Sequence, residues 1–156
     1  MSQEFADFSD EQLEAQLRLV EDKLQGRKLD LYKPHPKQML FHSLGGDPTI
    51  TDRLLMAGNQ LGKTLAASAE TAMHLCGRYP DWWQGKRFDH PVKGWVGCET
   101  SQAVRDAAQC LLMGEIGSWG TGMIPARYIK EWFKTPHGVP NSLDSVIVKH
   151  KRGGTS

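Results

Sequence analysis

Residues 57–64 carry the residue types and the spacing that bind the phosphates of a nucleotide. They read Ala-Gly-Asn-Gln-Leu-Gly-Lys-Thr and end on Gly62, Lys63 and Thr64. In a phosphate-binding loop of the pattern Gly-x4-Gly-Lys-Ser/Thr, backbone amides surround the phosphates, the lysine reaches the β- and γ-phosphates, and the hydroxyl ligates magnesium. Here Ala57 replaces the first glycine, and Gly58 follows one place later. The segment therefore predicts a site for ATP with Mg²⁺.

The segments on either side of this loop favour that interpretation. Residues 53–57 are short and apolar, as in a buried strand, and residues 63–75 are rich in alanine, which favours helix. A helix that begins at Lys63 would place its N-terminus, with its positive dipole end, against the phosphates. The alternative is a glycine turn beside an exposed lysine, which the order of strand, loop and helix disfavours.

A second feature favours a nucleotide. Gln38 and Phe41 follow Pro36 in a segment that lies about twenty residues before the loop. Pro36 suits the first position of a short helix. A glutamine amide offers one donor and one acceptor, which match one edge of adenine, and an aromatic ring can pack nearby. Gln38 is thus a candidate adenine-binding residue, and its alternative is an ordinary surface position on a helix.

The acids that hydrolysis requires are not evident. An ATPase uses one carboxylate to hold magnesium and another to polarise the attacking water, usually at the end of an apolar strand. The nearest local match is Glu99, which follows the weak strand pattern of residues 95–98. A structural role for Glu99 is the better interpretation. We expect the chain to hold the nucleotide-binding half of an ATPase without the hydrolytic half.

Local patterns predict further elements along the chain. A capping pattern at Ser9 precedes apolar residues at helical spacing, which predicts an amphipathic helix whose stripe buries against the main body or, alternatively, against a partner. This helix would span residues 9–25. The other predicted elements are a strand over 95–98, a helix from 100 or 101 to 113, a short helix over 125–130 and a strand over 145–149.

Length and composition bound the class of protein. The chain has 156 residues, 39% hydrophobic and 24% charged, which suits one globular domain. Its three cysteines form no Cys-x-x-Cys pair, which argues against a disulfide framework and fits a reducing compartment. The net charge of +1 favours no partner, but the start is acidic and residues 149–152 are basic. That basic run suits either a phosphate-rich partner or a solvated surface.

Three stretches together resemble the tailed-bacteriophage terminase large subunits. Residues 52–64 are similar to the Walker A region of that family, and residues 70–85, which include Tyr-Pro-Asp-Trp-Trp, are similar to its sequel. Residues 32–42 resemble the segment of the family that contacts adenine. The similarity runs from about residue 9 to the end of the chain, and it implies a motor that hydrolyses ATP to drive double-stranded DNA into an empty capsid.

The resemblance also implies a fold and a set of roles. The fold would be α/β, with a P-loop NTPase (ASCE) parallel sheet flanked by helices. We expect an incomplete version: an N-terminal helical segment over 1–30 and a partial ATPase domain over 31–156, with the Walker B part and the nuclease domain absent. Only three strands are evident where such a sheet needs about five or more. By position, Lys63 and Thr64 would be catalytic, Thr64 would ligate Mg²⁺ through its hydroxyl, and ATP would contact Gln38, Gly58, Asn59, Gln60, Leu61, Gly62, Lys63 and Thr64.

Further expectations follow from the family. Some members carry an arginine in the loop where this chain has Asn59, so Arg53 and Arg105 are the candidates for charge stabilisation, with no choice between them. The implied partners are double-stranded phage DNA, the terminase small subunit and the capsid portal, in a homo-oligomeric ring in the cytoplasm of the infected host. Two other readings stay open: a non-catalytic nucleotide-binding fragment that acts as an interaction or regulatory module, and an unrelated small P-loop enzyme such as a kinase.

Overall fold

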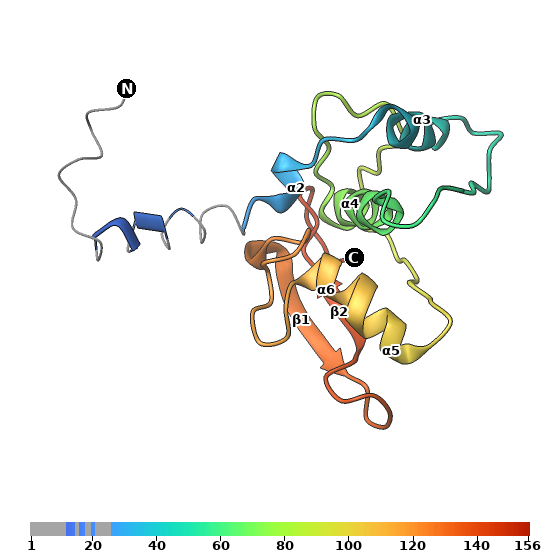
Figure 1. Cartoon of the computed structure of the whole chain (residues 1–156). Helices are drawn as coiled ribbons and strands as arrows, with labels where there is room; N and C mark the ends of the chain where they lie inside the picture. The colour runs from blue at the N-terminus through green and yellow to red at the C-terminus, as the bar shows by residue number, and fades with distance from the viewer. Residues whose placement is uncertain (1–11, 15, 18–19, 21–25) are drawn as a thin grey trace.

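The computed structural model describes residues 12–14, 16–17, 20 and 26–156. Figure 1 shows two helices, α3 and α4, beside each other, with α5, α6 and a two-stranded hairpin on the other side of α4. The elements, in chain order, are α2 (Lys28–Leu31), α3 (Pro36–Leu44), α4 (Lys63–Cys76), α5 (Ser101–Ala103), the π-helix η1 (Val104–Gln109), α6 (Cys110–Met113), the 3₁₀ turn η2 (Ala126–Tyr128), β1 (Ile129–Lys134) and β2 (Leu143–Val148).

α4 is the longest described helix and the centre of the core. Its alanines favour helix and allow close packing, and Ala66, Ala69 and Ala72 are fully buried. Glycines stand at both of its ends in the left-handed conformation, Gly62 with φ 72° and Gly77 with φ 64°. A Cβ on Gly77 would lie 2.2 Å from His150 Nε2, so that the helix must stop there on a residue without a side chain. The predicted helix over 63–75 is confirmed.

α3 begins where the sequence predicts. Pro36 occupies its first turn, and the side chain of Gln38 accepts a hydrogen bond from the backbone amide of His35 at 2.9 Å. α3 packs against α4 through Gln38 and His42, its two buried residues. The position of Gln38 therefore depends on both the start of α3 and its packing.

The sheet of the described part of the chain has two strands, which form an antiparallel hairpin. β2 confirms the strand predicted over 145–149, whereas residues 125–130, predicted as a helix, form only the short turn η2 before β1 begins. Buried Gln109 fixes the hairpin, because its side chain donates to the Asn141 carbonyl at 3.0 Å and accepts from the Leu143 amide at 2.8 Å. The protein is thus a small α/β structure, and this sheet is antiparallel rather than the expected parallel one.

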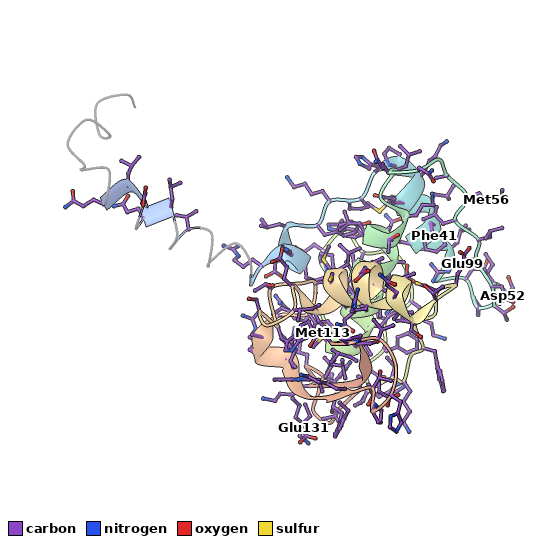
Figure 2. All side chains as sticks on the ribbon, turned by 60° about the horizontal axis from the view of Figure 1, so that its bottom comes forward. Phe41, Asp52, Met56, Glu99, Met113 and Glu131 are labelled. Atoms are coloured by element: carbon purple, nitrogen blue, oxygen red, sulfur yellow. The ribbon has the colours of Figure 1, made fainter. Side chains whose placement is uncertain are left out.

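Two predicted strands are extended but belong to no sheet. Residues 53–57 and 95–98 carry no strand assignment. Most of their apolar side chains face solvent: Leu54 and Met56 are each 82% exposed and Trp95 is fully exposed, whereas Leu55 is half-buried against the core. Figure 2 shows Met56 at the periphery of the molecule and Met113 among its packed elements. The two strands predicted at these positions are therefore not present in the described structure, because no neighbouring strand pairs with either segment.

The helix predicted from residue 100 or 101 to 113 is present but irregular. Thr100 caps it by accepting a hydrogen bond from the Ala103 amide at 3.1 Å. The helix then widens into η1 before it returns to α-helical geometry in α6. Met113 at its end is buried in the core, together with Met73 of α4 and Ile124. This segment joins α4 to the hairpin.

The predicted N-terminal helix lies mostly outside the described residues. Within it, residues 12–14, 16–17 and 20 have helical backbone. The described apolar side chains of its stripe, Leu13, Leu17 and Val20, are 37%, 56% and 51% exposed. The expectation that these three side chains bury against the main body was wrong. In the described part of the chain, no helix is long and apolar enough to cross a membrane.

Candidate phosphate loop and the ionic cluster beside it

The candidate phosphate loop is an exposed turn that leads directly into α4. Residues 57–61 are exposed, and positive φ angles at Gln60 (60°) and Gly62 (72°) bend the backbone before the helix. The helix start has no side-chain cap. The amides of the first helical turn have no partner within the helix itself, and the positive end of the dipole lies there. An exposed, uncapped helix start of this kind favours anions in general.

The two residues predicted to be catalytic lie at the start of α4. The ammonium Nζ of Lys63 donates hydrogen bonds to the carbonyls of Ala57 and Gly58, both at 2.7 Å, so the side chain folds back over the loop. Thr64 is exposed at the next position. A cation above an amide-rich turn, with a hydroxyl beside it, has the donor set that a phosphate and a hard metal ion require.

Gln38 contacts the loop rather than an open surface. The residue is only 5% exposed, and its Nε2 donates to the Gly62 carbonyl at 3.1 Å and approaches the Leu61 carbonyl at 3.5 Å. Its Oε1 is used by the His35 amide. A Cβ on Gly62 would lie 2.9 Å from this Nε2 and would displace the Gln38 amide, and the positive φ of 72° independently favours glycine there. Both ends of the Gln38 amide are therefore engaged within the protein, which leaves no free edge for a base in this arrangement.

An ionic cluster one turn further along the same buried face of α3, at His42, was not predicted from the sequence. Glu70 of α4 has a side chain only 9% exposed, yet its two oxygens meet three positively charged or donor groups. Arg53 contacts both of them, with Nη2–Oε1 at 2.5 Å and Nη1–Oε2 at 3.3 Å. His42 Nδ1 lies 2.7 Å from Oε2, and His74 Nε2 lies 3.3 Å from Oε1. A bidentate pair of this kind is among the stronger ionic contacts in proteins.

The cluster keeps Glu70 ionised. Burial raises the pKa of a carboxyl group, but hydrogen bonds from His42, His74 and Arg53, with the Arg53 charge, outweigh it and hold the pKa of Glu70 far below its ordinary value. The buried hydroxyl of Tyr32 lies 3.0 Å from His42 Nε2. Burial, and then the Glu70 charge, raise the pKa of Tyr32 to about 12. Tyr32 therefore stays a neutral hydrogen-bond donor.

The same cluster reaches the aromatic segment after α4. Because the carboxylate only accepts, His74 Nε2 donates to Glu70, and its Nδ1 is hydrogen-bonded to the Tyr79 hydroxyl at 3.0 Å. The Tyr79 oxygen in turn accepts from the Phe88 amide at 2.9 Å. A cavity of about 700 Å³ opens beside this network, lined among others by Phe41, Arg53, Glu70 and Lys86. The cavity does not include the loop residues.

The other residues singled out in the sequence lie apart from the loop. Arg105 is held by Asp106 at 2.6 Å and by the Pro140 carbonyl at 3.1 Å, on η1. Glu99 is exposed. Of the two arginines considered for charge stabilisation, Arg53 lies just before the loop, but both guanidinium groups are engaged by protein groups. The basic run is exposed at Lys149, Lys151 and Arg152, and the Lys151 amide bonds to the Cys76 carbonyl at 2.9 Å.

The three cysteines are free thiols, as the sequence predicts. Cys76 is fully buried at the end of α4, and burial raises the pKa of its thiol to about 12 despite the opposing charges of Arg78 and Arg127. A thiol in this state is neither a nucleophile nor a metal ligand at neutral pH.

Comparison with known proteins now identifies the class. The family model described as the terminase large subunit, T4likevirus-type, N-terminal, matches residues 54–152. These residues include the loop, α4, η1 and the whole hairpin. The chain therefore belongs to the terminase large subunit family, as the sequence resemblance predicts.

A curated relative gives the closer comparison. The chain is 38% identical over 161 residues to the protein named "Terminase, large subunit" of Salmonella phage P22, an alignment that covers 92% of this chain and 32% of the relative. The chain thus spans about a third of the length of that relative. No solved structure matches the chain.

The Glu70 cluster is the main feature that local sequence patterns missed. A glutamate within an alanine-rich helix is ordinarily read as a solvent-facing position. One signal was present: Glu70 and His74 stand four residues apart on a helix, a spacing that places them on the same face. Nothing local indicates that His42 and Arg53, from two other segments, meet them there.

Proposed function

We propose that residues 57–64 bind ATP with Mg²⁺. The observation behind this proposal is the position of Lys63, whose ammonium lies over the carbonyls of Ala57 and Gly58 at the uncapped start of a 14-residue helix. In the bound state the ammonium would leave these carbonyls and contact the β- and γ-phosphates. The amides of Gly58 to Gly62 and of the first helical turn would surround the phosphate oxygens.

Magnesium would reach this site with the nucleotide. Thr64 is the protein ligand that the loop pattern provides, and its exposed hydroxyl stands one residue from the ammonium that would hold the phosphates. Bound Mg²⁺ would supply charge neutralisation at the phosphate oxygens. Lys63 and Thr64 are thus the proposed catalytic residues, and Thr64 is the proposed metal ligand.

Membership of the terminase family supports a role in viral genome packaging. We expect the ATP-binding part described here to belong to a motor that couples ATP hydrolysis to the packaging of double-stranded DNA into a capsid, in the cytoplasm of the infected bacterium. The small subunit and the portal are its expected partners, with the motor as a homo-oligomeric ring. The exposed cations Lys149, Lys151 and Arg152 are the candidate contacts for DNA phosphates.

We propose that the motor domain contains a larger sheet than the two-stranded hairpin of the described structure. The exposed extended segments 53–57 and 95–98 have the apolar pattern of strands of a parallel P-loop sheet. We propose that they pair with further strands of that sheet, and that these strands also carry the carboxylates of hydrolysis. On this view the 156-residue chain binds ATP but does not hydrolyse it alone.

Titration calorimetry with Mg-ATP tests the proposed site. The chain should bind Mg-ATP, and Lys63→Ala should weaken binding by about thirtyfold, because a hydrogen bond to a charged group contributes about 2 kcal/mol. Lys134→Ala, on β1, is the matched control and should bind as the parent does. If Lys63→Ala binds ATP unchanged, the loop is not the site.

An ATPase assay separates the alternatives. Phosphate release that depends on Lys63 would show that this chain already holds its catalytic acids. It would contradict the proposal that further strands carry the carboxylates of hydrolysis. Binding without release supports either the motor fragment or a non-catalytic nucleotide-binding module. Phosphate transfer to an added acceptor would instead favour a small P-loop enzyme.

A further inference from the structure

Arg53 holds the entry of the candidate phosphate loop. It stands four residues before Ala57, and its guanidinium donates to the Phe41 carbonyl of α3 at 2.7 Å as well as to both oxygens of Glu70. Its Cζ lies 4.6 Å from the centre of the Phe41 ring. The other face of the group packs against Gly45, where a Cβ would come within 2.8 Å of Nη1. Arg53 is therefore fixed from several sides.

The exit of the loop is held by a different part of the same helix. Gln38, one turn before Phe41 in α3, bonds to the Gly62 carbonyl at 3.1 Å. Between these two attachments most side chains are exposed, Leu54 and Met56 each at 82% and Leu61 at 61%, whereas Leu55 is half-buried and packs against the core. The two attachments to α3 therefore hold the entry and the exit of the loop, and Lys63 bonds to its carbonyls in between.

Glu70 ties the entry to the helix that carries the binding residues. It lies on α4, seven residues after Lys63, and joins Arg53 to α4 while His42 joins α3 to the same carboxylate. The entry of the loop, α3 and α4 thus meet at one buried group. The Glu70 side chain is 9% exposed and that of Arg53 is 22% exposed, so loss of one member leaves the other with a partly buried, unmatched charge.

We propose that Arg53 and Glu70 are positioning residues, which fix the entry of the phosphate loop relative to the first turn of α4. This proposal rests on the proposed function, since it gives the loop a phosphate to bind. A loop with a free entry would have to be ordered during binding, and that ordering weakens affinity. The pair would act on every triphosphate equally, because it touches neither the base nor the sugar.

Backbone order without ligand is the first measurement. ¹⁵N relaxation on the 17.5 kDa chain compares the parent with Arg53→Gln, Glu70→Gln and Arg53→Lys. We expect lower order parameters over residues 54–61 in the two glutamine variants, with α4 unchanged, and partial recovery in Arg53→Lys, which keeps the charge but not the fork of donors. Val148→Ala, in the core on β2, is the destabilised control and should leave the loop unchanged.

The second measurement is the affinity of the parent and the variants for triphosphates. It is made at low temperature and refers to the folded fraction of each protein. Arg53→Gln and Glu70→Gln should weaken the binding of Mg-ATP and of inorganic tripolyphosphate by the same factor, about tenfold, whereas Val148→Ala should weaken neither. Unchanged order over residues 54–61 in both glutamine variants would overturn the proposal, as would parental affinity in both. If the parent chain binds no ATP, the proposed function fails, and the relaxation data still decide whether the pair positions the loop.

Discussion

At its amino end α4 begins in an exposed loop, whereas at its carboxyl end it stops among buried residues. Lys63, at the first end, bonds only to carbonyls of its own loop. At the second end Cys76 is fully buried, its carbonyl accepts from the Lys151 amide, and the Leu75 carbonyl accepts from the Ser156 hydroxyl. We call the carboxyl end anchored, because segments late in the chain hold it, and the amino end adjustable, because the ammonium of Lys63 has only loop carbonyls as partners, although Gln38 holds the Gly62 backbone there. The difference predicts that changes at the two ends affect different properties.

The largest effect should come from Gly77→Ala at the anchored end. An alanine there would adopt a left-handed conformation, and its Cβ would overlap the ring of His150. The two costs together should lower the free energy of unfolding by about 3 kcal/mol, measured by urea denaturation followed through tryptophan fluorescence. The Mg-ATP affinity of the folded fraction should not change.

Gly153→Ala is the matched control for that variant. Gly153 also has a positive φ, of 97°, but no atom lies within 4 Å of its would-be Cβ. Gly153→Ala should therefore lose stability only through the strained left-handed backbone, without a steric overlap of its Cβ. Equal destabilisation by the two variants would mean that the contact with His150 does not stop the helix.

The next largest effect is expected from acid, which lowers the stability of the fold by protonating Glu70 in the middle of α4. The pKa of Glu70 is depressed in the folded protein, so its contribution to stability is complete above the ordinary value of 4.5 and is lost as the pH falls toward the folded pKa. The groups that face it are Arg53, His42 and His74. Between pH 5 and pH 2.5 this group should account for a loss of about 2 kcal/mol, the scale of a hydrogen bond to a charged group.

Denaturation curves of the parent and of Glu70→Gln across that range check the prediction. Exposed carboxylates contribute to the acid sensitivity of both proteins, and their contribution cancels in the comparison. The variant should be less stable at pH 7 and should lose less stability in acid. Parallel pH profiles of the two proteins would contradict the assignment of an ionised, buried Glu70.

A smaller effect is expected from Gln38→Ala at the adjustable end. If Gln38 acts through the Gly62 carbonyl, the variant should weaken Mg-ATP and Mg-GTP alike, by about fivefold, as expected for one net hydrogen bond of about 1 kcal/mol. Competition binding with both nucleotides makes the comparison. A loss confined to ATP would instead support the adenine contact that the sequence suggests.

The smallest effect concerns the exposed approach to the loop. Leu54→Thr and Met56→Thr remove apolar side chains that already face water, so each should change the free energy of unfolding of this chain by less than about 0.5 kcal/mol. Both variants should remain soluble at higher concentration than the parent, measured by light scattering. A destabilisation above about 1 kcal/mol would mean that the side chain of Leu54 or Met56 is packed within this chain rather than exposed.

The sequence predicted those features whose causes are local. α4 follows from an alanine-rich run closed by Gly77, and α3 follows from Pro36 at its first position, whereas the capping role of Gln38 was not predicted. The loop was evident from the spacing of Gly62, Lys63 and Thr64. The family was also predicted from short stretches, and the family model and the phage relative bear it out.

The features that were predicted wrongly or missed are those that depend on residues distant in the sequence. An apolar run such as residues 53–57 indicates extended chain, but a strand exists only where a neighbour pairs with it. β1 was missed because Ile129 to Lys134 lacks a regular alternation, and its pairing with β2 supplies what the local pattern does not. The Glu70 cluster escaped for the same reason, since its members come from three separate segments.

The dual use of the Gln38 side chain has a final consequence. One amide group both caps α3, at the His35 amide, and holds Gly62 at the start of α4. Any ligand that shifts Gly62 must therefore change the stability of the first turn of α3. Because such coupling is reciprocal, a partner that docks on that turn would change nucleotide affinity by the same factor. The outer surface of α3 would then be a place from which a neighbouring molecule regulates the loop without touching it.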